Sequence, residues 1–132
     1  MKYLLDTNVC IKYLNADSVR IVENLKKHMP DDITLCSVVK SELLTGAYKS
    51  NVTDKVLKKL NVFFDKFTSL VFDDEAADMY GKIRAELEKA GSAIGPYDMQ
   101  SASIAIVHNL ILITHNINEF SRIKDLKMED WE

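Results

Sequence analysis

An apolar segment near the start of the chain, Tyr3-Leu4-Leu5, stops abruptly at Asp6. The segment predicts a short buried strand bounded by turn-forming polar residues. An acid at the end of such a strand lies at the rim of a sheet, and open α/β sheets bind ligands at the carboxyl ends of their strands. The alternative is that Asp6 or Thr7 only caps the helix that follows, and this segment alone favours neither interpretation.

Further short apolar segments recur along the chain, with amphipathic segments between them. The predicted strands after the first are residues 33–36, 70–72 and 110–114, and an edge strand around Ile123, Leu126 and Met128, with Trp131 as a plug. The predicted helices are residues 9–14, 19–29, 37–48, 52–67, 74–90 and 97–107. In the second helix, the shared apolar face is expected at Val19, Val22, Leu25 and Met29. Strands that alternate with helices imply crossover connections and a parallel sheet, so we expect one α/β domain.

The charge balance limits how this chain can meet a polyanion. Its 17 basic and 20 acidic side chains give a net charge of −3, whereas proteins that bind nucleic acid through bulk charge are usually basic. Such a substrate would have to meet a local basic patch or metal ions. The best patch consists of Lys55, Lys58, Lys59 and Lys66, most of which we expect to form an ordinary solvated helix face.

The expected location is the cytoplasm. No apolar segment approaches the roughly 18 residues of a membrane span, and the first residues do not resemble a signal peptide. Cys10 and Cys36 each lie in an apolar segment, which favours buried free thiols over a disulfide or a thiolate metal site.

Glu42 is the second acid in an unusual position. On a helix that begins at Ser37, it falls at the edge of the inward face, between Val38 and Gly46. A carboxylate near apolar packing needs a partner charge or a metal, because burying it alone is costly. The alternative is a glutamate whose stem merely packs at the rim.

Asp98 lies in the first turn of its helix, where the helix dipole alone would favour an acid. It also shares a face with Ser101, Ala102 and Ala105. We interpret this face of small residues as the wall of a pocket, since small side chains fill a core poorly.

Asn116 follows the strand that ends at Thr114, so it belongs to the same rim as Asp6, although a lone asparagine there is more often a turn former. Three carboxylates and an amide on one rim suit a hard cation such as Mg²⁺ or Mn²⁺. The histidines look too scattered for a zinc site: His28, His108 and His115. The chemistry that fits best is metal-assisted phosphodiester hydrolysis.

Four segments, in order, resemble the motifs of PIN-domain ribonucleases. Residues 3–14 resemble the first motif (YLLDTNVCIKYL), and residues 37–50 the second (SVVKSELLTGAYKS). Residues 83–105 resemble the third (IRAELEKAGSAIGPYDMQSASIA), and residues 110–131 the closing segment of VapC-type toxins (LILITHNINEFSRIKDLKMEDW). The resemblance covers essentially the whole chain. It implies a single PIN domain over residues 1–132, with a three-layer fold: a central, mostly parallel sheet and helices on both faces.

The resemblance is strongest to the VapC toxins that act on initiator tRNA. It implies a Mg²⁺-dependent endoribonuclease, with Mn²⁺ as a substitute, that cuts the anticodon loop of that tRNA and halts translation. It also implies a VapB antitoxin whose C-terminal segment covers the active-site groove, and a homodimer.

The resemblance also assigns roles to individual residues. Asp6 and Asp98 would be metal ligands, and Glu42 a ligand directly or through water. Asn116 stands where many PIN domains have a fourth acid, which leaves a second metal and the part of Glu119 open. The supporting residues would be Thr7 and Asn8, which orient the ligands, Thr114 beside Asn116, and Arg84, which contacts phosphate or belongs to a solvated helix face.

Two rival functions remain at this stage. A phosphatase with an aspartyl nucleophile at Asp6 would want a second acid two residues later, and that position is Asn8. A catalytically silent PIN-like binding module is the other rival, and the intact Asp6, Glu42 and Asp98 argue against it. The apolar positions Leu57, Leu60 and Phe64 either form a partner groove or belong to the core, and we favour the core.

Overall fold

A computed structural model describes residues 1–132 and contains one five-stranded sheet. The strands are β1 (Tyr3–Leu5), β2 (Ile33–Cys36), β3 (Thr68–Leu70), β4 (Ile111–Ile113) and β5 (Lys127–Glu129). They lie in the order β3-β2-β1-β4-β5, and all four pairings are parallel. The prediction of an α/β fold with a mostly parallel sheet is confirmed.

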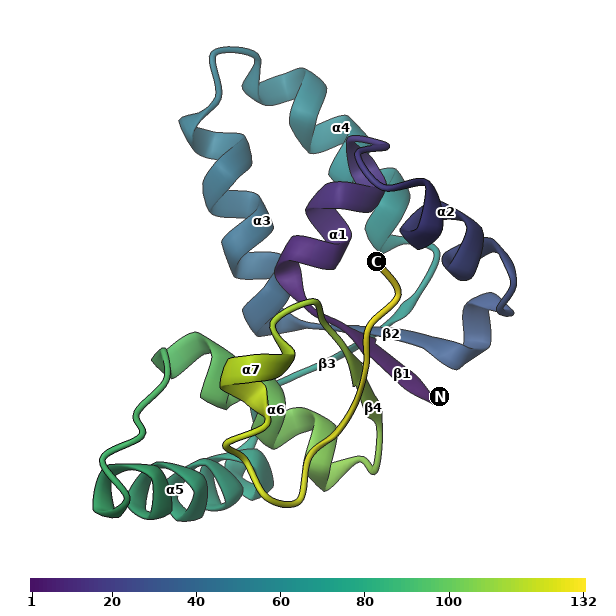
Figure 1. The fold of residues 1–132 in the computed structure, drawn as a ribbon. Coiled ribbons are helices and arrows are strands. Elements are labelled where there is room, and N and C mark those ends of the chain that lie inside the picture. The colour runs from purple at the N-terminus through teal and green to yellow at the C-terminus, as the bar shows by residue number, and fades with distance from the viewer.

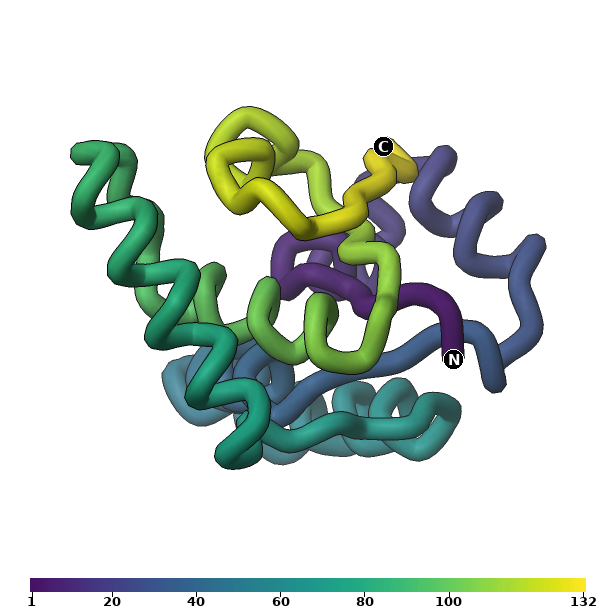
Figure 2. Tube along the Cα trace, turned by 90° about the horizontal axis from the view of Figure 1, so that it is seen from below, coloured from purple at the N-terminus to yellow at the C-terminus, as the bar shows by residue number.

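Helices cover both faces of this sheet. The helices are α1 (Thr7–Leu14), α2 (Val19–Lys26), the 3-10 helix η1 (Pro30–Asp32), α3 (Ser37–Lys49), α4 (Thr53–Phe64), α5 (Asp74–Lys89), α6 (Pro96–Val107) and α7 (Ile117–Phe120). Helices α1 to α4 lie above the strands in Figure 1, and α5 and α6 lie below them. Figure 2 shows α5 set off to one side of the sheet and α2 to the other. No helix is both long enough and apolar enough to cross a membrane.

The strand order explains this division of the helices. From β1 the chain proceeds to β2 and β3 in one direction, and from β3 it crosses back to β4 and β5. Because crossover connections are right-handed, helices on the outward and return paths fall on opposite faces. The strand order therefore changes direction between β1 and β4, and the crevice beyond their carboxyl ends is the usual ligand site of an open parallel sheet.

The core contains 31 buried hydrophobic residues around the two central strands. Leu4 and Leu5 of β1 and Leu112 and Ile113 of β4 are fully buried, as expected of strands covered on both faces. Trp131 is buried against Tyr3 and stacks on His28 with ring centroids 4.9 Å apart, so its predicted role as a plug is confirmed.

Several elements differ from the prediction: β5 contains Met128 but neither Ile123 nor Leu126, α4 ends at Phe64 instead of residue 67, and α7 was not predicted. Strand β3 ends at Leu70, because its register with Thr34–Cys36 places Thr68–Leu70 in the sheet and leaves Val71 exposed. In α2 the buried residues are Ile21 and Leu25, and Val19 and Met29 are exposed. Helix α2 ends at Lys26, so Met29 is no longer on the face that the periodicity assigned to it.

The small residues of α6 were also misinterpreted. Ser101, Ala102 and Ala105 do not line a pocket; they are fully buried in the core. Their size lets α6 approach the sheet closely, and Ser101 Oγ lies 3.9 Å from the Sγ of Cys36. Cys10 and Cys36 are buried free thiols, as predicted. Leu60 is buried, and Leu57 and Phe64 pack against the core, which also agrees with the prediction.

Candidate active site

Asp6 lies immediately after β1, at the point where the chain turns into α1. Its side chain is buried and accepts two hydrogen bonds: Oδ1 from the Thr7 N–H at 2.9 Å, and Oδ2 from the Thr114 hydroxyl at 2.9 Å. Asp6 is the N-cap of α1, so the capping interpretation is correct as well. Burial raises the pKa of Asp6, and the two hydrogen bonds oppose that rise.

Thr114 and Asn116 follow the end of β4 and lie across the site from α1. The Thr114 hydroxyl that donates to Asp6 also accepts from the Asn116 N–H at 3.0 Å. The Asn116 side-chain amide donates to Glu119 Oε2 at 3.1 Å. A continuous chain of hydrogen bonds thus fixes Asp6, Thr114, Asn116 and Glu119 relative to one another.

Glu42 reaches the same place from α3. Its Oε1 accepts a hydrogen bond from the Thr7 hydroxyl at 2.8 Å, and its side chain is half-buried. Because Thr7 also donates its backbone N–H to Asp6, one residue connects the two carboxylates. The inward-edge position predicted for Glu42 is therefore confirmed, and its partner is Thr7.

Asp98 completes the group from the first turn of α6. Its pKa is raised to about 6, with burial as the largest cause and the negative charges of Asp6, Glu42 and Glu119 as the others. These charges act on Asp98 only because the acids of separate elements converge. A raised pKa at clustered acids is typical of a functional site, since ordinary folding gains nothing from crowding like charges.

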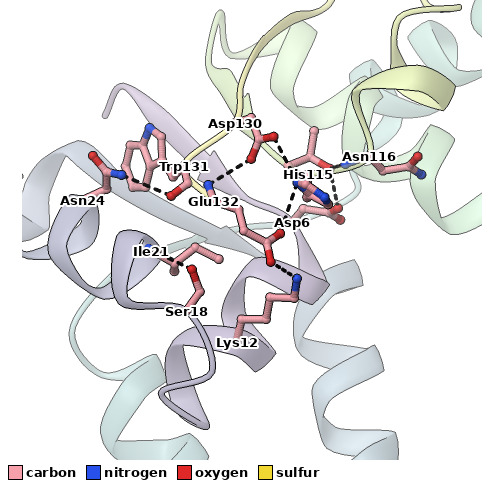
Figure 3. Close-up of polar contacts among 11 residues, drawn as sticks. Asp6, Lys12, Ser18, Ile21, Asn24, His115, Asn116, Asp130, Trp131 and Glu132 are labelled. Carbon is pink, nitrogen blue, oxygen red and sulfur yellow. Dashed lines mark hydrogen bonds and ion pairs between the residues drawn. The ribbon is translucent and has the colours of Figure 1, made fainter.

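A polar pocket of about 340 Å³ opens beside Asp6, in the crevice between β1 and β4. Its lining residues are Asp6, Asn8, Ile11, Lys12, Asp17, His115 and Asn116. Figure 3 labels Asp6, His115 and Asn116 among these residues, and the Asn116 side chain extends away from the other two. The candidate ligands are all oxygen donors, which suit a hard divalent cation, and a bound cation would relieve the repulsion that raises the pKa of Asp98.

Comparisons with known proteins agree with this geometry. The family model of the PIN domain matches residues 3–126. The chain is 36% identical to the ribonuclease VapC2 of Rickettsia felis over 133 residues, which covers 100% of this chain and 99% of the relative. The chain belongs to the VapC family of PIN domains. The resemblance inferred from the four motifs is thereby confirmed.

Other VapC relatives match over nearly their whole length. The tRNA(fMet)-specific endonuclease VapC of Salmonella typhimurium is 34% identical, with 99% of this chain and 98% of the relative covered. Among solved structures, VapBC2 from Rickettsia felis bound to a DNA fragment from its promoter superposes with a TM-score of 0.93, at 35% identity and full coverage of both chains. DNA-bound VapBC from Salmonella typhimurium gives 0.94, at 34% identity with 100% and 99% covered. VapC members of this kind are metal-dependent nucleases, and the acids of this chain fit that chemistry.

Of the predicted supporting residues, Arg84 stands apart from the VapC acids, and Asn8 lies in the pocket of Asp6. Arg84 lies on the exposed face of α5, where it donates to Glu88 Oε1 at 2.8 Å and to the Tyr80 hydroxyl at 3.1 Å. These contacts match the solvated-face interpretation. Asn8 is exposed and lines the polar pocket.

Sequence reasoning missed a second polar group at this rim. His115 was grouped with the scattered histidines, but its Nδ1 lies 3.0 Å from Asp130 Oδ2 and 3.2 Å from Glu132 Oε2. The three side chains offer ligand atoms within 4.8 Å of one another, and Glu132 also pairs with Lys12. Only the pairing of β5 with β4 brings residues 130–132 here, so no local sequence signal could have shown it.

An apolar pocket of about 310 Å³ adjoins Glu42 on the other side. Its lining residues are Ile11, Leu14, Asn15, Glu42, Leu43, Gly46, Ala47, Val56, Lys59 and Leu60. These residues come from α1, α3 and α4. A segment that occupied this pocket would lie directly beside one of the three acids.

Proposed function

We propose that this chain is the toxin of a VapBC-type toxin–antitoxin pair, an endoribonuclease that cleaves tRNA with the help of a divalent cation. The observation that carries the proposal is the contact geometry of the acids: Thr7 donates its N–H to Asp6 and its hydroxyl to Glu42. Asp98 feels the negative charges of both, which add to the effect of burial in raising its pKa. The names of the relatives support it, since they are ribonucleases and endonucleases of the VapC family. The whole of residues 1–132 would act as one PIN domain, in the cytoplasm where tRNA is found.

The cation is Mg²⁺, for which Mn²⁺ can substitute. Asp6 and Asp98 would hold it as direct ligands, and Glu42 directly or through a water molecule. When bound, the ion would activate the attacking water and stabilise the leaving oxygen of the phosphodiester. The intact set of acids favours this enzyme over a silent binding module.

The chain itself prepares the site for this ion. Thr114 and Thr7 fix both oxygens of Asp6, so the carboxylate is oriented before any ligand arrives. Thr7 also orients Glu42. Asn116 cannot carry a charge, and the neighbouring Glu119 supplies the negative charge that this position lacks.

The substrate that we propose is the initiator tRNA, cut in its anticodon loop. A Salmonella relative at 34% identity is a tRNA(fMet)-specific endonuclease. Because the chain is acidic overall, the phosphates of RNA need positive charge close to the site. Lys12 and Lys59 supply it, since they lie in the two pockets that adjoin the acids.

Cleavage of purified tRNA in Mg²⁺ tests this proposal. Asp6→Asn and Asp98→Asn should each lower the cleavage rate by more than about a hundredfold, because both would remove a metal ligand, and EDTA should abolish cleavage. The matched control is Asp54→Asn, which also removes an acid from the first turn of a helix but on an exposed surface. Cleavage that survives in Asp98→Asn, or that is lost equally in Asp54→Asn, would contradict the proposal.

The partner is a VapB-type antitoxin, and we propose that one of its segments occupies the apolar pocket beside Glu42. Solved relatives at 35% and 34% identity are VapBC assemblies bound to DNA. The pocket borders Glu42, so a segment bound there would crowd the approach of RNA to the acids, and this would account for neutralisation by the partner. The expected homodimer stays a prediction of the family resemblance.

A further inference from the structure

Lys12 is the only lysine or arginine that lines the polar pocket of Asp6. It lies on α1, which begins directly after Asp6, so it is held at a fixed place relative to the acids. In Figure 3 its ammonium group extends toward Glu132, on the same side of the molecule as Asp6. A lone cation in a pocket otherwise rich in acids and amides is well placed to meet a phosphate of an RNA strand.

In this structure the ammonium group of Lys12 forms an ion pair with Glu132. The Glu132 Oε1 pairs with Lys12 Nζ, while its Oε2 lies 3.2 Å from His115 Nδ1. The Lys12 side chain is 35% exposed and that of Glu132 is 23% exposed. A partly exposed ion pair of this kind adds little stability. The Glu132 carboxylate is therefore an oxyanion that another oxyanion can displace.

The neighbouring Trp131 explains why Glu132 points at Lys12. The indole of Trp131 is buried, its Nε1 donates to Glu129 Oε2 at 3.1 Å, and its carbonyl accepts from the Asn24 side chain at 3.1 Å. The Glu132 N–H donates to Asp130 Oδ1 at 2.9 Å. Trp131 thus anchors the segment, and only the Glu132 side chain has to move for Lys12 to become free.

We propose that Lys12 contacts a phosphate of the bound RNA, and that the Glu132 carboxylate takes the place of this phosphate until RNA displaces it. The inference rests on the proposed ribonuclease function. It makes residues 130–132 an internal competitor of the substrate, beside the acids that perform the chemistry.

The two partners of this one ion pair give a decisive test. Binding of initiator tRNA is measured by fluorescence anisotropy in the Asp98→Asn background, which prevents turnover. Lys12→Gln should raise Kd about tenfold or more, the effect of one lost charge-assisted contact. Glu132→Gln should lower Kd, because it frees Lys12. Lys12→Arg should restore binding, and the Lys12→Gln/Glu132→Gln double variant should behave like Lys12→Gln.

Salt dependence adds a readout that a purely structural ion pair would not change. Lys12→Gln should reduce the slope of log Kd against log salt by about 0.7 to 0.9, the value for one phosphate contact. The control pair is Asp78 and Lys82, an exposed ion pair of 3.3 Å on α5, where Lys82→Gln and Asp78→Asn should change Kd less than about twofold.

Three results would overturn the inference: Kd shifts in the same direction for Lys12→Gln and Glu132→Gln, no shift in either variant, or no measurable binding of tRNA. A purely structural ion pair gives the first of these, because either substitution breaks it equally. The proposed function fails separately, if the chain with native Asp98 does not cleave tRNA while the opposite shifts in Kd are still observed.

Discussion

Asp98 shows how much of this site depends on single side chains. The sequence places it in the first turn of a helix, where an acid needs no special explanation. Its environment differs from that of an ordinary helix acid, because burial and three neighbouring acids raise its pKa to about 6. No local pattern could predict this, since Asp6, Glu42 and Glu119 come from distant parts of the chain.

This pKa predicts how stability depends on pH. The folded pKa of about 6 exceeds the ordinary value of 3.8, so the folded state binds more protons between these values. The contribution of Asp98 to the free energy of unfolding therefore falls as pH rises through about 4 to 6, and stays low above that window. Asp98→Asn removes the charge, and should stabilise the chain in EDTA by about 1 kcal/mol at neutral pH, since solvent screens a half-buried carboxyl.

Urea unfolding at about pH 4 and at neutral pH measures this effect. The variant should gain much less at about pH 4, where the folded carboxyl is almost fully protonated and the unfolded carboxyl is only partly ionised. A variant that is less stable than the native chain at neutral pH, or whose gain is the same at both pH values, would show that Asp98 does not carry this electrostatic cost.

At the scale of elements, the sequence predicted the strands and helices well where one force dominates. The apolar strand β4 is where the pattern placed it, and α5 begins at Asp74, as predicted. The predictions failed where contacts with neighbouring elements decide the boundaries or the burial of residues. The register with β2 decides which residues form β3. Helix α6 packs closely on the sheet, so its small residues, which were expected to line a pocket, are buried in the core. Gly46, expected on the inward face of α3, is exposed and lines the apolar pocket.

Gly46 provides a test of the antitoxin site on α3. A Cβ at Gly46 would meet no atom within 4 Å, and the same holds at Gly81, a second helical glycine on α5. Gly46→Leu and Gly81→Leu should therefore each stabilise their helix by roughly 0.5 to 1 kcal/mol. Only Gly46→Leu fills the pocket of about 310 Å³, so only it should weaken binding of the VapB-type antitoxin, by roughly tenfold or more.

Thermal unfolding and isothermal titration with the antitoxin measure the two effects. The comparison separates a filled pocket from a general change in helix stability, because Gly81→Leu shares the second effect and lacks the first. Equal affinity of the two variants for the antitoxin would place the docking segment elsewhere.

At the scale of the whole molecule, the order of the strands creates the site. Successive strands are added on one side of β1 and then, from β4 on, on its other side, and this change opens the crevice beside Asp6, Thr114 and Asn116. Sequence reasoning predicted a common rim because parallel strands end on the same side. It did not predict that β5 would carry residues 130–132 back to this rim, since that contact depends on the order of strands in space.

The central claim is that Asp6, Glu42 and Asp98 together hold one divalent cation. Anomalous diffraction from crystals soaked in Mn²⁺ tests it most directly, because it locates the ion without reference to activity. We predict a peak at coordination distance, about 2.1 Å, from carboxylate oxygens of Asp6 and Asp98. A peak only at His115, Asp130 and Glu132, or no peak at the three acids at any Mn²⁺ concentration, would contradict the claim.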